Sequence, residues 1–265
     1  MARGILWWWL FLLSVTTEGQ DGLANRMAGA EALYSKDPGI WGLKSYSASL
    51  AMRNSTMVGV YGEKKFMSEL SVVESLICFS IRKHGFLFSV SREGITDYLI
   101  TKAGFSAGIK LASGLMMGIN LGYSGEKIKG YAPSGELDAG LGILLQLNEK
   151  MRVGVQLDHI PSLFETAKFS FQTKAGFGYY LSEACALSIE ISKMGGKPLI
   201  VDMGICYSFH PLFYARLGCS PARSLFSFGT GFRQRQLNIE IGAAYHLSLG
   251  PTMGLGLTYR FKEAE

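Results

Sequence analysis

Four histidines are the residues best suited to acid–base chemistry, and they lie far apart in the sequence: His84, His159, His210 and His246. Only His159 has an acidic neighbour, Asp158. If this segment is a β-strand, neighbouring side chains point to opposite faces, so the pair cannot form a simple catalytic dyad. The sequence therefore predicts no catalytic residue, and an enzyme is the weakest of the three functional hypotheses developed below.

The cysteines offer no metal chemistry either. Cys78, Cys185, Cys206 and Cys219 show no C-x-x-C spacing, and the cysteines and histidines form no cluster with the spacing of metal ligands. We interpret them as small, partly apolar residues of a sheet, although an exported chain would permit disulfides. The sequence thus predicts no metal ligand and no cofactor.

A third group consists of single charges within segments that alternate between large apolar and small or polar residues. Their spacing places them all on the small, polar face. The members are Arg152, Asp158, Lys168, Lys174, Glu190, Asp202, Arg216, Glu240 and Arg260. Both signs are present, which leaves two interpretations: mutual pairing that closes an interior, or a polar lining for the path of a solute.

The elements that must carry these charges are β-strands with a period of two. In residues 115–123 and 253–261 every odd position is large and apolar, while most even positions are glycine, serine or polar. A soluble sandwich would show many large charged residues on its polar face. Alternation of this kind, in a chain with 33 glycines and only 7 prolines, is typical of an all-β, antiparallel transmembrane barrel.

The alternating segments give a strand count of about fourteen, an even number as single-chain bacterial barrels require. The predicted strands are 46–62, 72–82, 85–93, 98–111, 115–126, 136–147, 151–159, 167–181, 185–193, 199–209, 212–219, 225–233, 237–247 and 252–261. Joints after even-numbered strands are tight, whereas several after odd-numbered strands are longer. Since such barrels have short periplasmic turns, we expect both ends of the barrel chain in the periplasm.

The N-terminal residues predict export. Arg3 is followed by the apolar run 5–13, and Thr17 and Gly19 stand at the −3 and −1 positions of a cleavage site that leaves Gln20 first. Residues 1–19 are therefore predicted to be a signal peptide, with a retained N-terminal anchor as the alternative. Together with the barrel pattern, this indicates the bacterial outer membrane.

Residues 20–43 differ from the barrel that we place at 44–265. They contain a short, weakly helical stretch whose apolar and basic residues are candidates for a plug in the lumen: Leu23, Arg26, Met27 and Leu33. A disordered periplasmic tail is the alternative. We favour a plug or hatch because a tail would rarely be this apolar.

Both ends of the mature chain resemble a known family. Residues 27–30 (Met-Ala-Gly-Ala), the following Asp37-Pro38-Gly39 and the closing hairpin 244–261 are similar to FadL-like outer-membrane barrels of Bacteroidetes, including the PorV/PorQ group. The Asn-Pro-Ala-Gly-Leu-Ala element usual there survives only as Trp41-Gly42-Leu43 and Ser49-Leu50-Ala51. The resemblance implies fourteen strands with an N-terminal segment in the lumen.

The same resemblance implies two functions. The leading hypothesis is a barrel that passes or binds a small hydrophobic molecule. The second is a scaffold that holds a protein of a type IX secretion-like system through its outside loops. Besides membrane lipid these are the only expected partners, since the basic residues behind the net charge of +5 are scattered and do not suggest nucleic acid.

Overall fold

The computed structural model describes residues 31–35, 38–66, 69–160 and 171–261. Two short α-helices and a 3-10 helix come first: α3 (Glu31–Tyr34), α4 (Ile40–Ser45) and η1 (Ser47–Met52). A second 3-10 helix, η2 (Pro221–Arg223), lies between two strands. No helix among the described residues is long and apolar enough to cross a membrane.

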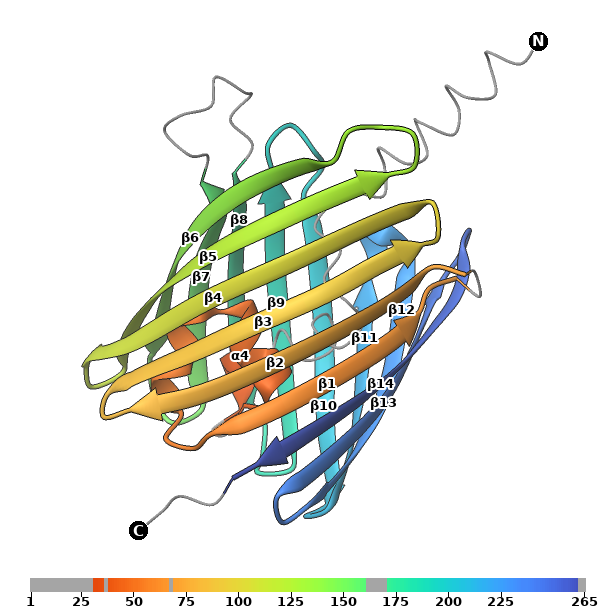
Figure 1. The fold of residues 1–265 in the computed structure, drawn as a ribbon. Coiled ribbons are helices and arrows are strands. Elements are labelled where there is room, and N and C mark those ends of the chain that lie inside the picture. The colour runs from red at the N-terminus through yellow and green to blue at the C-terminus, as the bar shows by residue number, and fades with distance from the viewer. Residues whose placement is uncertain (1–30, 36–37, 67–68, 161–170, 262–265) are drawn as a thin grey trace.

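The rest of the described chain is antiparallel sheet. The strands are β1 (Met57–Lys64), β2 (Ser71–Ile81), β3 (His84–Ile95), β4 (Tyr98–Ala112), β5 (Leu115–Ile128), β6 (Ser134–Gln146), β7 (Met151–Ile160), β8 (Gln172–Tyr180), β9 (Cys185–Met194), β10 (Ile200–His210), β11 (Phe213–Ser220), β12 (Leu225–Gln234), β13 (Leu237–His246) and β14 (Gly250–Arg260). Each strand pairs with its neighbour in sequence, and β1 pairs with β14 to close the barrel (Figure 1). The predicted fourteen-stranded fold is confirmed.

The outer face of the barrel is apolar, as the alternation requires. Side chains at outward positions, such as Val60, Ile119, Leu255 and Leu257, remain exposed. Tyr207 and Tyr245, near strand ends, also lie exposed on this face. An apolar outer band with aromatic residues toward its edges is the surface that lipid requires.

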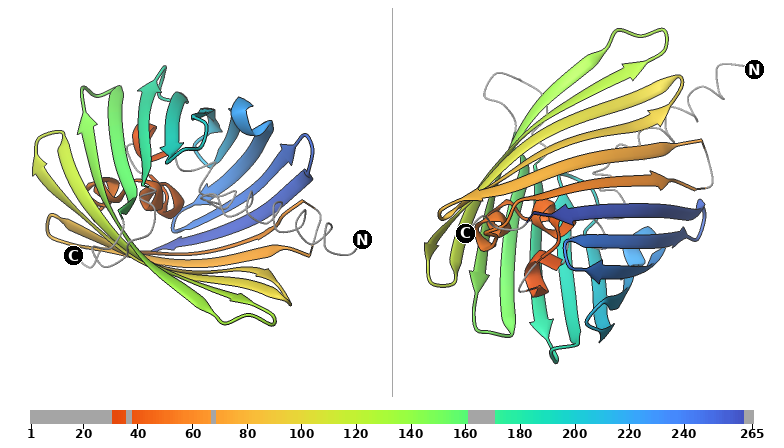
Figure 2. Two further views of the ribbon diagram at one scale, coloured as in Figure 1. Left: turned by 90° about the horizontal axis from the view of Figure 1, so that it is seen from above. Right: turned by 60° about the horizontal axis from the view of Figure 1, so that its bottom comes forward.

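The buried core lies inside the barrel rather than between two sheets. One cluster gathers Ile40, Trp41 and Leu43 of α4 against inward residues of β1–β3, and a second surrounds Leu33 and Tyr46. In Figure 2, the helices appear within the ring of strands. A barrel of fourteen strands is too wide for wall side chains to fill, so the helices supply its core.

The first strand predicted, over 46–62, is wrong in its first half. Residues 47–52 form η1, and β1 begins only at Met57. The segment Ser47-Ala-Ser-Leu-Ala-Met alternates small and larger residues as a strand would, but its backbone lies on the inner wall. The helical segment thus continues beyond residue 43, and the boundary at 44 falls inside α4. Its described residues, 31–35 and 38–53, are called the plug from here on.

The connections follow the expected alternation, with two exceptions. Joints after even-numbered strands are short, such as 82–83, 113–114 and 235–236, and several after odd-numbered strands are longer, such as 65–70 and 129–133. The β3–β4 joint has two residues and the β13–β14 joint has three, although both follow odd-numbered strands. Below, the ends of the barrel are called the turn end (joints after even strands) and the loop end (joints after odd strands).

Candidate functional site

A row of glycines on the inner wall receives η1. Four glycines are paired in register across β3, β4, β5 and β6: Gly85, Gly108, Gly118 and Gly142. A Cβ at Gly118 would lie 2.3 Å from the carbonyl carbon of Ser47, and one at Gly85 would lie 2.1 Å from the oxygen of Leu50. Real side chains cannot occupy that space, so the plug backbone is seated directly on the sheet. We call this set the glycine row.

Next to the glycine row, Gln156 of β7 fixes the start of η1. Its Oε1 accepts hydrogen bonds from the backbone N–H (3.2 Å) and the hydroxyl (3.1 Å) of Ser47. Its amide Nε2 donates to Asn120 (2.9 Å) and to Asp158 (2.8 Å). One buried amide therefore connects the plug to polar groups of β5 and β7.

Tyr46 and Leu33 fill the middle of the lumen. The Tyr46 hydroxyl donates to the Glu190 carboxylate on β9 at 2.7 Å. Burial raises the pKa of the Tyr46 phenol well above its usual value and Glu190 raises it further, so the hydroxyl stays protonated and donates. Both side chains pack against Gly154 and Gly176, where a Cβ would lie within 3 Å of them. We call these two residues the seal.

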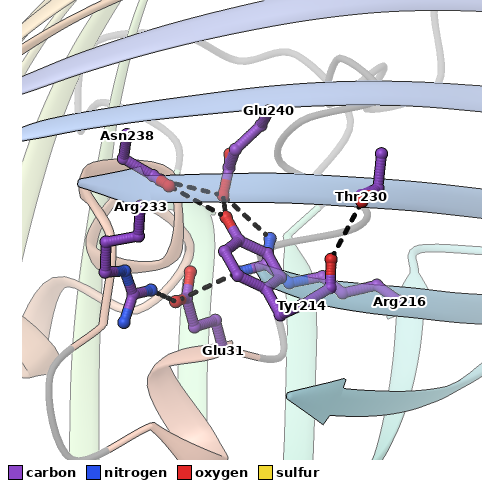
Figure 3. Close-up of polar contacts among 7 residues, drawn as sticks. All are labelled: Glu31, Tyr214, Arg216, Thr230, Arg233, Asn238 and Glu240. Carbon is purple, nitrogen blue, oxygen red and sulfur yellow. Dashed lines mark hydrogen bonds and ion pairs between the residues drawn. The ribbon is translucent and has the colours of Figure 1, made fainter. Parts of the chain in front are cut away.

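Glu31 of α3 forms ion pairs with the part of the barrel wall made by β11 and β12. Its Oε1 lies 3.1 Å from Arg216 on β11 and 3.9 Å from Arg233 on β12 (Figure 3). Arg216 also contacts Glu240 at 3.3 Å, and its guanidinium lies 4.7 Å from the ring centre of Tyr214. The Tyr214 hydroxyl donates to Glu240. Since Glu31 and Arg216 are almost fully buried, each requires the other to offset the loss of water.

Further cations hold the plug at the turn end. Nη1 of Arg152 donates to the carbonyl oxygens of Ala32 and Ser35, both at 2.8 Å. Arg53 follows η1, and its Nη2 donates to Ser55 at 2.9 Å and to the Sδ of Met57, the first residue of β1, at 3.1 Å. Burial lowers the pKa of Arg53 to about 10, which leaves the group charged at neutral pH.

Two cavities lie toward opposite ends of the barrel. Tyr34, next to Leu33 of the seal, borders one of them, and Ser45 and Ser47, on either side of Tyr46, border the other. The inner chamber, about 700 Å³, is bounded by Glu31, Tyr34 and turn-end residues that include Lys150, Ala184 and Phe213. The outer chamber, about 360 Å³, is bounded by Lys44, Ser45 and Ser47 of the plug and by residues toward the loop end of β2–β8. The inner wall combines four aromatic side chains, Tyr34, Tyr180, Phe213 and Tyr214, with three acidic and three basic residues whose formal charges cancel. The outer wall is dominated by hydroxyl, amide and charged groups.

The structure brings most of the predicted inward charges to the plug or the chambers. Arg152, Glu190, Arg216 and Glu240 belong to the contacts described above. Asp158 and Lys174 border the outer chamber. Asp202 is paired in register with Glu190, and Arg260 with Met57. Lys168 lies outside the described residues.

Of the predicted plug residues, the structure describes only Leu33, which is buried in the seal. Leu23, Arg26 and Met27 lie outside the described residues, as does the predicted signal peptide, 1–19. Sequence reasoning missed Glu31, Tyr46 and the glycine row. An aligned row of glycines on neighbouring predicted strands is a signal that could have revealed the seat of η1.

The histidines give little support to catalysis. Nδ1 of His210 accepts from the backbone N–H of Leu212 (3.2 Å), and Nδ1 of His246 accepts from that of Ser248 (3.1 Å), so both stabilise turns. His159 has a positive φ of 57°, which breaks the strict alternation, and it borders the same chamber as Asp158. Its buried Nδ1 has no hydrogen-bond partner, so Asp158 does not orient it.

A serine motif that sequence reasoning overlooked also fits poorly. Residues 104–108 have the spacing Gly-x-Ser-x-Gly, but they lie within the continuous strand β4. A nucleophile elbow requires a sharp turn from strand to helix, which this segment does not make. Within the described chain, the four cysteines are free and no three His, Cys, Asp or Glu residues are grouped to hold a metal ion.

No family model and no curated protein matches this chain. Solved structures, however, match this chain in fold. The toluene transporter TbuX of Ralstonia pickettii aligns with a TM-score of 0.70 at 10% identity, over 94% of this chain and 100% of that one. The toluene transporter TodX of Pseudomonas putida gives 0.68 at 9% identity, over 91% and 97%.

A FadL homologue of Pseudomonas aeruginosa also aligns, with a TM-score of 0.64 at 9% identity, over 89% of this chain and 98% of that one. At such low identities the likeness concerns the fold and not the residues of a binding site. This chain therefore has the closed, fourteen-stranded barrel fold of the FadL-like and toluene-transporter structures.

Proposed function

We propose that this chain is an outer-membrane channel that passes a small, largely hydrophobic molecule through its lumen. The observation that carries the proposal is the pair of chambers, about 700 and 360 Å³, toward opposite ends of the barrel. Both volumes are within the range of small-molecule sites. The partly aromatic inner wall and the shared fold with toluene transporters favour a hydrophobic cargo.

The proposed export route is that of the sequence prediction: residues 1–19 direct secretion and are removed. The turn end then faces the periplasm and the loop end the outside, because short turns occur on the periplasmic side of such barrels. A molecule entering from outside would meet the outer chamber first, then the seal, then the inner chamber.

The test targets the seal. Replacing Tyr46→Ala should connect the chambers, because it removes a ring that fills the middle of the lumen. Liposomes carrying this variant should swell faster in a small sugar than liposomes carrying the unaltered protein. Tyr46→Phe keeps the ring and loses only the hydrogen bond to Glu190, so its rate should stay close to the original. Equal rates for all three proteins would refute a lumenal route.

A second proposal follows the PorV/PorQ resemblance: an accessory barrel that holds a secretion-system protein. The supporting observation is the β5–β6 hairpin, where Tyr131 is 70% exposed and Leu137 68% exposed near the loop end. A photoreactive residue at position 131 should then crosslink one recurrent partner in cells. The absence of any recurrent partner, beside a working channel assay, would leave the channel as the sole function.

A further inference from the structure

The outer chamber differs in chemistry from the hydrophobic route proposed above. Its wall includes six carboxylates and three lysines, a formal charge of −3. The acids are Glu74, Glu93, Glu126, Glu136, Asp138 and Asp158, and the bases are Lys44, Lys102 and Lys174. The remaining lining is rich in serine, with Ser89, Ser91, Ser106 and Ser124 among the wall residues. Apolar residues such as Val72, Leu87 and Ile100 also border the chamber, but more of its wall is polar than apolar.

Two of the acids are already neutralised by ion pairs. Glu74 binds the ammonium of Lys44, and Glu93 lies 2.5 Å from that of Lys65. Lys65 does not border the chamber, so its pair with Glu93 reduces the formal charge at the wall to −2. What remains is an excess of carboxylate on the wall formed by β5, β6 and β7.

The small residues of β5 leave room in front of these carboxylates. Glu136 is paired in register with Ser124, and Asp138 with Gly122. The Asp138 carboxylate extends over Gly122, where a Cβ would lie 2.5 Å from its Oδ2. Asp158, on β7, is held by Asn120 at 3.0 Å and by Gln156. Negative charge is thus fixed along three strands rather than at one point.

This spread argues against an inorganic ion. In the described chain, no three acidic or histidine side chains are close enough to surround a metal ion. Divalent cations require several oxygen ligands at short range. An organic ammonium group requires only an overall negative field and hydrogen-bond acceptors, which this wall supplies.

We propose that the outer chamber selects small organic amines, so that the cargo has a positively charged amine on a hydrophobic body. This inference rests on the proposed channel function and specifies its substrate class. The ammonium group would interact with the carboxylates and hydroxyls of the outer chamber. The apolar body would suit the aromatic wall of the inner chamber once the seal has opened.

Three probes with one ring test the charge preference: benzylamine, benzyl alcohol and benzoate, titrated calorimetrically into the purified barrel at neutral pH. In low salt, benzylamine should bind about tenfold more tightly than benzyl alcohol, the effect of about two charges at close range in a wet cavity. Benzoate should bind most weakly. Raising the salt concentration should reduce these differences, because salt screens exposed charges.

A matched pair of variants locates the effect. Glu136→Gln with Asp138→Asn removes two carboxylates from the outer chamber and should abolish most of the preference for benzylamine. Glu149→Gln with Glu183→Gln removes two carboxylates from the inner chamber and should leave the preference intact. An equal loss in both double variants would show that only net charge matters, and would overturn the inference.

Three further outcomes test the amine inference and the channel function separately. If benzyl alcohol binds as tightly as benzylamine, the amine inference fails while the hydrophobic channel survives. If magnesium chloride displaces benzylamine far better than sodium chloride of equal ionic strength, the chamber is an inorganic cation site and the inference fails. If no probe binds and the Tyr46→Ala variant does not swell liposomes, the channel function fails as well.

Discussion

Glu31 shows how a single charge is retained in the middle of a lumen. Its carboxylate is 3% exposed and faces Arg216, while Arg216 has a second acid, Glu240, at 3.3 Å. Burying either charge alone would cost several kcal/mol. Together with the ring of Tyr214 they form a network that connects the plug to β11 and β13. The plug is therefore bound to the wall by charge as well as by packing.

The prediction at this scale concerns coupling between Glu31 and Arg216. Glu31→Gln should destabilise the barrel by about 3 kcal/mol, because it leaves Arg216 with one acid fewer in a buried site. Arg216→Met should cost a similar amount, but the double variant should be more stable than the sum of the two losses predicts. Urea unfolding in micelles measures all three. Losses that add within about 0.5 kcal/mol would contradict direct coupling.

The alternation of the strands determined which of these residues could be predicted from the sequence. Arg216 and Glu240 follow from alternation alone, because a period of two places them inward. Glu31 and Tyr46 do not, since they belong to segments without such a period. Their partners lie more than a hundred residues away in sequence, and only the closed barrel brings them together.

The helices and strands likewise divide into those that the sequence predicts and those that it does not. Except for β1, which begins eleven residues after its predicted start, the strands lie within about five residues of their predicted bounds. Each alternates over ten or so residues and ends at a turn. η1 was mistaken for a strand because Ser47 to Met52 contains no proline, no glycine and no clear helical stripe. Its structure is determined by the glycine row, which is formed by four strands later in the chain.

A glycine substitution tests this seat. Gly118→Ala places a Cβ 2.3 Å from the backbone of Ser47, so either η1 or the wall must move. We expect a loss of about 1–3 kcal/mol, as is typical of overpacking, and faster protease cleavage within the plug. Gly62→Ala is the matched control, since the nearest atom to its Cβ would be 4.0 Å away. Equal stability of the two variants would mean that η1 does not need the row.

At the scale of the whole molecule, the width of the barrel determines how much of its lumen must be filled by something other than wall side chains. Eight strands already enclose a lumen that side chains can fill, and fourteen enclose more. The plug occupies the middle of that space and leaves a chamber at each end. The sequence could predict the width from its strand count, and hence the need for a filler, but not the shape of what remained open.

Two measurements test the molecule as a whole. The folded protein should migrate faster than the boiled protein on a gel run in detergent, as closed membrane barrels resist unfolding without heat. Mass spectrometry of the protein isolated from outer membranes should find Gln20 as the first residue. Migration that does not change with heating would contradict a stable barrel, and a retained Met1 would contradict the predicted cleavage.

The glycine row also links the evolution of two distant parts of the chain. At Gly85, Gly108 and Gly118, the backbone of η1 occupies the space that wall side chains would otherwise fill. A descendant that lost residues 47–52 would leave a water-accessible gap, and larger residues at 85, 108 and 118 would then become favourable. Conversely, a side chain gained at any one of these positions would select against the present plug. Wall and plug should therefore vary together among relatives.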